Sequence, residues 1–357
     1  MAIFLAEAIR KFDPQAQFEG IGSERMREAG FALWRDHTGW ASMGPLAAIP
    51  RIPKLLDAML RTAFHIVASK PDLVVLVDFG VFNLRLANTL RRYLHYTGEI
   101  MDLFPPGTWL DNPQKARNVS EVSIPVTAFA HQHDFYKSLG LRSQYFGHPL
   151  ASRYRMRELH AAPPSDGGVV AMLPGSRTGE LRRHLPVLAQ AYRTLAQRRP
   201  RLRGVFGAAD DRAQALMRAT IAGERLSRVD VVRGAEAALS QADGAWVASG
   251  TAVLEAALTG VATVAIYVIP PVLIAYGHRM IKHRFITLPN LVLGREVVPE
   301  LLQDDATPQN LADALERLMI DPAPQYEAFV ELRTALGPAD ALERCAKYAV
   351  ALARGAA

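Results

Sequence analysis

The chain has 357 residues, of which 50% are apolar and 21% are charged, and its formal net charge is +6. This length favours two domains over one, and the composition is that of a globular protein rather than a disordered or fibrous one. The single cysteine, Cys345, excludes an internal disulfide and favours a cytosolic protein. No apolar run reaches the roughly 20 residues that cross a membrane, and we expect no signal peptide.

The excess of positive charge favours anionic partners, such as phosphates or an acidic membrane surface. The basic residues form no dense run and no nucleic-acid-binding motif is evident, so we expect no nucleic acid among the partners. We also expect no cofactor and no metal, because no paired carboxylates or His/Cys cluster have the spacing of metal ligands.

The first half of the chain begins with a predicted helix at residues 2–11 and a predicted strand at residues 18–22. Residues 50–69 form an amphipathic segment, in which apolar residues at helical spacing oppose Arg51, Lys54 and Arg61. This helix either packs on a sheet or rests on anionic lipid.

The clearest strand of the first half is predicted at residues 71–78. It ends at Asp78, and open α/β sheets place catalytic groups where their strands end. Asp78 is therefore a candidate catalytic residue, with a capping or hydrogen-bonding role as the alternative.

In the second half, an apolar run at residues 169–173 has the length of a buried parallel strand, and an amphipathic helix is predicted after it. Gly175 lets the backbone turn tightly between them, Ser176 is the predicted N-cap, and Arg177 adds a permanent planar cation. The free N–H groups of the helix start suit a diphosphate, and an ordinary capped turn is the alternative.

A second turn of this kind follows a predicted strand at residues 245–248. Ser249, Gly250 and Thr251 open a helix, and Glu255 lies one turn further on. A carboxylate there can accept two ribose hydroxyls, or it can cap the helix. Two such turns in one half predict a nucleotide at the carboxyl ends of parallel strands.

The strands and helices of the second half alternate, which indicates a parallel sheet with crossover helices. The predicted strands lie near residues 169–173, 203–207, 229–232, 245–248 and 262–268. The first domain is expected to end near Leu150, and Thr307 is the predicted N-cap of a later helix that has Pro308 at its first position.

The motifs of the second half stand in the order and spacing of the lipid-A-disaccharide synthases, which the chain resembles along nearly its whole length. They are Leu-Pro-Gly-Ser-Arg at 173–177 with Glu180, Ala-Ser-Gly-Thr-Ala at 248–252 with Glu255, and Leu-Pro-Asn-Leu at 288–291 with Gly-Arg-Glu at 294–296. These enzymes are glycosyltransferases of the GT-B type. The resemblance implies an α/β fold of two Rossmann-like domains whose parallel sheets face a central cleft.

The same resemblance implies an acceptor (lipid) domain at residues 1–150, a UDP-sugar domain at residues 151–323, and C-terminal helices at residues 324–357 that cross back to the first domain. The implied reaction inverts the sugar's anomeric centre. It transfers 2,3-diacylglucosamine from UDP-2,3-diacylglucosamine to 2,3-diacylglucosamine 1-phosphate (lipid X), giving the disaccharide 1-phosphate and UDP. The implied location is the cytoplasm, with peripheral attachment to the anionic inner face of the bacterial inner membrane. A homodimer is left open.

The residues that the resemblance places at the substrates are those of the three motifs. They are Ser176, Arg177, Glu180, Ser249, Gly250, Thr251, Glu255, Asn290 and Glu296. A metal is not implied.

The chain departs from the family at the catalytic base, where the family's second aspartate falls on Val81. A valine cannot take a proton, so Asp78 is our candidate base. Substitute candidates for the base, near a rebuilt loop of the first half, are His95, Glu99 and Asp102. His131 and His133 either contact the acceptor or are solvated loop residues.

Two other departures concern the donor side and the start of the chain. The family has a basic residue after the tyrosine at position 267, and a basic cluster further on either replaces it or forms a solvated helix face: His278, Arg279, Lys282, His283 and Arg284. The family also opens with a strand and a Gly-rich turn that would precede this sequence, and we expect a misplaced start codon rather than a lost strand.

Three alternatives to the implied reaction stay open. The chain is a diverged GT-B glycosyltransferase with another acceptor, a non-catalytic UDP-sugar-binding paralogue, or a nucleotide-sugar epimerase of similar fold.

Overall fold

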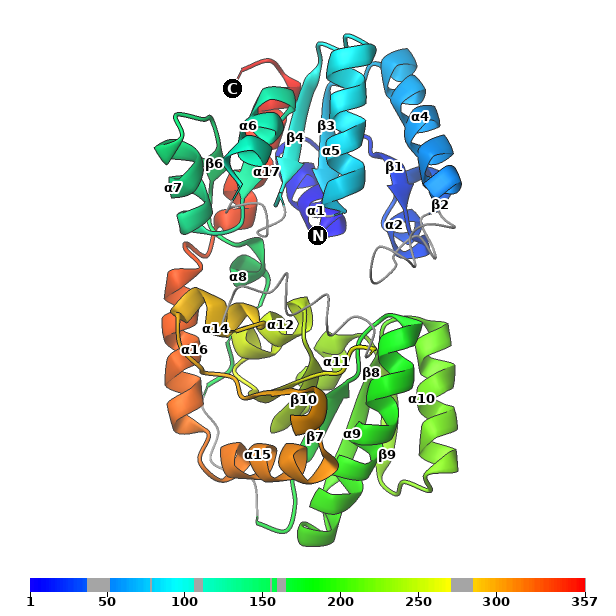
Figure 1. Ribbon diagram of the computed structural model, residues 1–357, viewed down its shortest axis with the longest axis vertical. Coiled ribbons are helices and arrows are strands. Elements are labelled where there is room, and N and C mark those ends of the chain that lie inside the picture. Colours follow the sequence, from blue (N-terminus) through cyan, green and yellow to red (C-terminus); the bar gives the residue numbers. More distant parts are fainter. Residues whose placement is uncertain are drawn as a thin grey trace. The chain divides into compact units, whose positions relative to one another are not determined.

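The computed structural model describes residues 1–36, 52–77, 79–105, 112–154, 156–158, 165–270 and 285–356. The chain divides into two compact units, each of which contains α-helices and parallel β-strands (Figure 1). Unit 1 comprises Met1–Arg153 and Leu336–Ala357, and unit 2 comprises Tyr154–Ala335. Of the two C-terminal helices, α16 (Ala323–Ala335) belongs to unit 2 and α17 (Ala341–Ala353) to unit 1.

Unit 1 contains a four-stranded parallel sheet of order β3-β4-β5-β6 and a separate parallel pair, β1-β2. The strands are β1 (Glu19–Gly22), β2 (Ala32–Asp36), β3 (Leu73–Val77), β4 (Glu99–Leu103), β5 (Ile124–Thr127) and β6 (Gln144–Tyr145). The remaining helices are α1 (Ala2–Phe12), α2 (Glu24–Glu28), α4 (Ile52–Ser69), α5 (Gly80–Asn88), the π-helix η2 (Thr89–Tyr93), α6 (Pro113–Val122), α7 (Ala130–Ser138) and α8 (Pro149–Arg153).

Two hydrophobic cores cover opposite faces of the four-stranded sheet. Successive residues of β3 alternate between them, because side chains of a strand point to opposite faces in turn. Helices α1 and α17 pack together on one face, where Ile9 and Cys345 are buried, and α4 and α5 cover the other. The predicted helix at residues 2–11 and the core position of Cys345 are confirmed.

Unit 2 contains a six-stranded, fully parallel sheet of order β12-β11-β10-β7-β8-β9. Its strands are β7 (Val169–Leu173), β8 (Arg203–Ala208), β9 (Val229–Arg233), β10 (Gly244–Ala248), β11 (Ala262–Tyr267) and β12 (Glu300–Leu302). Its helices are α9 (Thr178–Arg198), α10 (Asp211–Gly223), α11 (Ala235–Leu239), α12 (Thr251–Thr259), α14 (Leu288–Leu293), the 3₁₀ helix η4 (Gln303–Asp305), α15 (Pro308–Ile320) and α16.

The core of unit 2 forms where α9 and α15 lie side by side on the sheet (Figure 1). Trp246 of β10 is fully buried there, and its indole N–H donates to the Leu311 carbonyl at 2.9 Å. As expected, Thr307 caps α15 by accepting from the Asn310 N–H at 3.1 Å. The predicted α/β class with parallel sheets is confirmed.

None of the described helices combines the length and the apolar composition that would let it span a bilayer.

Candidate functional site

The order of the strands in unit 2 creates a switch point between β7 and β10. From β7 the chain runs outward through β8 and β9, and it then returns to place β10 on the other side of β7. Parallel α/β sheets bind ligands outside the carboxyl ends of the strands at such a point. Both predicted turns lie there, because the first follows β7 and the second follows β10.

Glu180 organises the first turn. Its side chain is buried, and its carboxylate accepts from the backbone N–H of Arg177 at 3.3 Å and from the guanidinium of Arg177 at 2.7 Å. Gly175 has a φ of +103°, and a Cβ on it would lie 2.6 Å from a carboxylate oxygen of Glu180. A carboxylate in the first turn also suits the positive end of the helix dipole.

The helix cap differs from the prediction. The N-cap of α9 is Arg177, and the predicted cap, Ser176, lies one residue earlier and is exposed. The carboxylate of Glu180 takes the capping role, because it reaches back to the backbone N–H of the N-cap. Arg177 keeps about half of its side chain exposed (51%), so it pairs with Glu180 and still faces solvent.

His184 ties the first turn to the end of β11. Its Nδ1 lies 2.8 Å from the Pro174 carbonyl oxygen, and its Nε2 accepts from the Val268 N–H at 3.0 Å. Arg183 adds a hydrogen bond from Nε to the Val268 carbonyl at 2.8 Å. Burial lowers the pKa of His184, which fits a neutral ring that donates through Nδ1 and accepts through Nε2. Sequence reasoning missed this residue, whose one signal is its place on the buried face of α9.

The second turn presents polar groups at the start of α12. Ser249 is half-buried, and its backbone N–H donates to the Ile266 carbonyl at 3.0 Å. Gly250 is the N-cap, and both it and Thr251 are exposed. Glu255 is half-buried one turn further on. The start of α12 therefore offers backbone N–H groups beside the first turn, which is the arrangement that binds anions.

Asn290 lies fully buried, and its described hydrogen bonds are all internal. Its amide oxygen accepts from the N–H groups of Val297 and Val298, both at 2.8 Å. Its amide nitrogen donates to the Val298 carbonyl at 2.8 Å and to the Glu300 carboxylate at 2.9 Å. In this structure Asn290 holds the backbone in place and has no exposed atom to offer a ligand, whereas Glu296 is exposed.

Glu300, which sequence reasoning also missed, closes the same network. Its carboxylate accepts from the backbone N–H of Ile286 at 3.0 Å, and from the N–H and hydroxyl of Thr287 at 2.9 and 2.7 Å. Thr287 is the N-cap of α14, so a carboxylate from β12 caps this helix from outside it. Nothing local in the sequence signals this contact.

In unit 1 the candidate base, Asp78, lies outside the described residues. Val81, in the first turn of α5, is 62% exposed, and Phe79 before it is exposed as well. Glu99 begins β4 and His95 precedes it, so these two lie at the amino edge of the sheet, away from the strand ends where such sites form.

Asp102 is buried within β4. His131 and His133 lie on α7, which follows β5 at the carboxyl edge of the sheet. The basic cluster from His278 to Arg284 lies outside the described residues. Within the described ranges, no group of three or more His, Cys, Asp and Glu side chains is placed to hold a metal ion.

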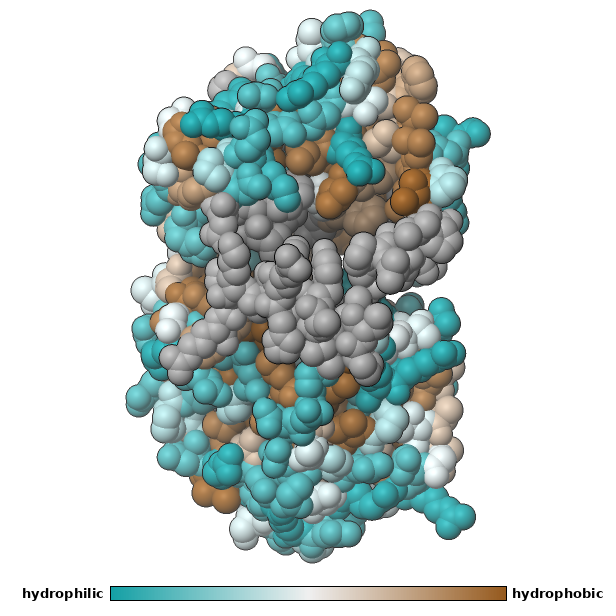
Figure 2. Space-filling model, in the orientation of Figure 1, coloured by the Kyte–Doolittle hydropathy of each residue, from teal (hydrophilic) through white to brown (hydrophobic). Residues whose placement is uncertain are grey.

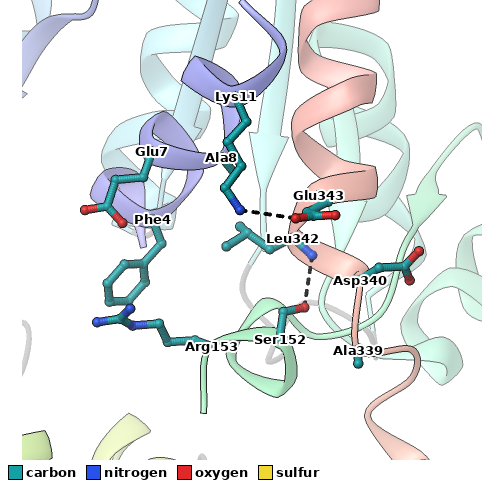
Figure 3. Close-up of a pocket in the computed structure, with 10 residues that line it drawn as sticks. All are labelled: Phe4, Glu7, Ala8, Lys11, Ser152, Arg153, Ala339, Asp340, Leu342 and Glu343. Atoms are coloured by element: carbon teal, nitrogen blue, oxygen red, sulfur yellow. Dashed lines mark hydrogen bonds and ion pairs between the residues drawn. The ribbon is translucent and has the colours of Figure 1, made fainter. Parts of the chain in front are cut away.

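Unit 1 also has a cavity of about 420 Å³ between α1, α8 and α17 (Figure 3). An ion pair between Lys11 and Glu343 at 3.2 Å and a hydrogen bond from the Leu342 N–H to the Ser152 hydroxyl at 3.2 Å cross it. Its lining mixes charges of both signs and includes no strand end, so it lacks the features that the switch point of unit 2 has.

Two α/β units with parallel sheets, one with a pair of strand-to-helix turns at a switch point, are the architecture of the GT-B class. Solved structures share the fold. The one described as "S. aureus MnaA-UDP co-structure" has a TM-score of 0.64 at 12% identity and covers 99% of this chain and 93% of its own. A putative UDP-N-acetylglucosamine 2-epimerase from Listeria monocytogenes has a TM-score of 0.57 at 12% identity, with coverages of 98% and 92%.

The family comparison is more specific. The model of the family described as "Lipid-A-disaccharide synthetase" matches residues 3–350. The lipid-A-disaccharide synthase of Myxococcus xanthus is 32% identical over 98% of this chain and 93% of its own length. That of Neisseria meningitidis serogroup A is 35% identical over 87% of this chain and 83% of its own length. The chain belongs to the lipid-A-disaccharide synthetase family, whose members are glycosyltransferases of lipid A biosynthesis.

Proposed function

We propose that this chain transfers 2,3-diacylglucosamine from UDP-2,3-diacylglucosamine to lipid X, giving the lipid A disaccharide 1-phosphate and UDP with inversion. The pair of turns at the β7/β10 switch point is the observation that supports the donor half most directly. Family membership supports the acceptor half. In this proposal unit 2 binds the UDP-sugar and unit 1 binds the acceptor.

The donor site needs positive charge and N–H donors, because the leaving diphosphate gains negative charge in the transition state. The half-exposed side chain of Arg177 and the N–H groups that start α9 and α12 supply both. Ser176 and Thr251 add exposed hydroxyls, and Glu255 accepts from the ribose. Glu180, Asn290 and Glu300 hold these groups in position from within the protein.

The acceptor half needs a group that takes the proton of the attacking hydroxyl. Asp78 follows β3 directly and is the carboxylate that the sequence offers there. Because position 81 is a valine, the catalytic base is the part of the proposed site that differs most from the family.

The function is tested by incubating the chain with UDP-2,3-diacylglucosamine and lipid X and following UDP and disaccharide by mass spectrometry. Disaccharide formation confirms the proposal. A rise in melting temperature with UDP but no turnover would instead identify a UDP-sugar-binding paralogue. Release of UDP with another acceptor would identify a diverged glycosyltransferase.

Replacing Gly175 with alanine is expected to weaken UDP binding by tenfold or more. The new Cβ meets Glu180 at a φ that L-residues rarely adopt, so the carboxylate must leave the backbone of Arg177. The control is Gly179→Ala inside α9, where a Cβ meets nothing closer than 3.4 Å and stability should rise by up to about 1 kcal/mol. Isothermal titration with UDP measures both variants, and equal affinities would contradict the assignment.

We further propose that unit 1 rests on an anionic membrane surface through α4. This helix buries one face through Met59 and Ala63 against the sheet, yet it exposes a second apolar stripe. The stripe consists of Ile52 (49% exposed), Leu56 (49%), Leu60 (40%) and Phe64 (60%). Figure 2 shows apolar residues gathered over α4, and the spacing of four places them along one side of a helix.

Replacing both Leu56 and Phe64 with serine is expected to weaken binding to vesicles that contain phosphatidylglycerol by about tenfold, roughly 1.4 kcal/mol. Vesicle sedimentation measures the binding. The control is Ile320→Ser, which removes an equally exposed apolar residue (61%) from unit 2. Equal losses in both proteins would show that α4 is not the contacting surface.

A further inference from the structure

An aromatic row lines the carboxyl edge of the sheet of unit 1. Phe104 stacks on His148 with ring centroids 5.8 Å apart and an interplanar angle of 13°. His148 contacts Phe129 at 5.3 Å, and Phe129 stacks on His131 at 5.6 Å and 12°. Four rings from three separate stretches of the sequence therefore form one continuous series.

The parallel order of the strands creates this row, because equivalent ends of neighbouring strands meet at one edge. Phe104 directly follows β4, Phe129 follows β5, and His148 follows β6. Phe104 has a φ of +64°, a conformation that is costly for a bulky residue and that tends to occur at functional sites. His131, in the first turn of α7, is the exposed end of the row.

The three histidines of this edge have different surroundings. His148 is buried, and its Nδ1 accepts from the Leu150 N–H at 3.2 Å. His133 lies 2.7 Å from the Ser143 hydroxyl through Nδ1. His131 makes no hydrogen bond through its ring to any residue that the structure describes, and it is exposed.

The chemistry of His131 suits proton transfer. Partial burial lowers the pKa of its imidazole, and the Asp134 carboxylate opposes this shift. The ring is therefore largely neutral at neutral pH, and a neutral imidazole accepts a proton. Phe129 packs nearly parallel to the ring, which favours one orientation in which it can meet a substrate hydroxyl.

We propose that His131, rather than the sequence candidate Asp78, accepts the proton of the attacking acceptor hydroxyl, in place of the carboxylate that position 81 lacks. This inference rests on the proposed function. As the hydroxyl O–H bond breaks, its proton passes to the imidazole and the oxygen forms a bond to the anomeric carbon of the donor sugar. The bond from that carbon to the diphosphate oxygen breaks, UDP leaves with the electron pair, and the imidazolium then loses its proton to solvent.

The sheet order sets where the acceptor must lie. His131 follows β5, and Val81 follows β3, two strands away, which corresponds to roughly 10 Å at the usual spacing of strands. The hydroxyl is therefore approached from the β5 end rather than from the β3 end. Exposed Phe79 and Val81 are left as an apolar surface for the hydrocarbon part of the acceptor.

The test compares His131→Ala with His133→Ala and Asp78→Asn in the mass-spectrometric assay. We expect His131→Ala to lower kcat by about 10²–10⁴-fold and added imidazole to restore part of the rate. The UDP-induced rise in melting temperature should be unchanged, since UDP binds unit 2. His133→Ala should stay within fivefold of the parent. A loss in Asp78→Asn with His131→Ala near the parent rate would overturn the proposal.

A second readout separates this inference from the proposed function. The protein is labelled with ¹³C-histidine, and the His131 resonance is assigned by its absence in His131→Ala. Addition of lipid X should shift that resonance and leave that of His133 in place. If the parent forms no disaccharide, the proposed function fails, and the shift alone decides whether His131 contacts the acceptor. An unmoved His131 resonance overturns the inference in either case.

Discussion

Replacing Asn290 with leucine is expected to lower the free energy of unfolding of unit 2 by about 3–5 kcal/mol. Leucine has a similar volume but can neither accept from the N–H groups of Val297 and Val298 nor donate to the Glu300 carboxylate. Each buried polar group left without a partner costs about 1–3 kcal/mol. The effect should be large because Asn290 has no solvent-exposed atom through which water could replace it.

Equilibrium unfolding in urea measures this loss, and hydrogen exchange at β11 and α14 assigns it to unit 2. The control is Glu296→Gln, an exposed change six residues away that should alter stability by no more than about 0.5 kcal/mol. A loss of less than 1 kcal/mol for Asn290→Leu would mean that the loop rearranges and supplies its own hydrogen bonds.

The same variant should weaken UDP binding. The Glu300 carboxylate fixes the start of α14 through Thr287, and the Ile286 carbonyl before it lies 3.5 Å from the Ser249 hydroxyl of the second turn. We therefore expect the loss of order at the start of α14 in this variant to disturb the turn after β10. If the switch point binds the donor as proposed, this link gives Asn290 a positioning role there without any contact to the nucleotide.

The sequence predicts five of the six strands that the structure describes in unit 2, mainly because strands buried on both faces appear as continuous apolar runs. The short edge strand β12 (Glu300–Leu302) was not predicted. The predicted run at residues 169–173 and the observed β7 coincide, and the predicted run at residues 203–207 is one residue shorter than β8. The switch point also follows from the sequence once two turns of the same kind are recognised, since each comes directly after a buried strand.

Contacts between distant residues could not be predicted in this way. Gln325 of α16 donates to the Thr263 carbonyl and accepts from the Thr263 N–H, at 2.9 and 2.7 Å, across 62 residues of sequence. His184 acts over a longer separation, 84 residues, and Glu300 reaches Thr287 across 13 residues. Ser176 was predicted as the N-cap because local propensity favours serine, but the buried carboxylate of Glu180 determines the cap one residue later.

The candidate site of unit 1 shows the same limit. Comparison of one short motif is enough to recognise that Val81 differs from the family. The aromatic row can be recognised only once the fold is known. Phe129 lies 25 residues after Phe104 (129 − 104) and 19 residues before His148 (148 − 129), and the three share an edge only because β4, β5 and β6 are parallel neighbours. The sequence alone shows each of these residues but does not show that their rings are in contact.

Unit 1 is expected to lose stability as the pH falls from about 6.5 to about 4, and His148 is the residue responsible. Burial among Phe104 and Phe129 lowers the pKa of His148 to about 4. In that range the unfolded chain binds a proton at this residue and the folded chain does not. The stability contributed by the neutral ring is therefore complete above pH 6.5 and declines below it, by up to about 3 kcal/mol in total.

His148→Gln tests this expectation, because glutamine keeps an acceptor for the Leu150 N–H and does not titrate. The free energy of unfolding in urea is measured for both proteins from pH 7.5 to pH 4, and the difference between them removes the contributions of all other groups. The parent should lose about 3 kcal/mol relative to the variant over this range. A constant difference would show that His148 has the same pKa in the folded and unfolded protein, and so is not shielded from water by Phe104 and Phe129.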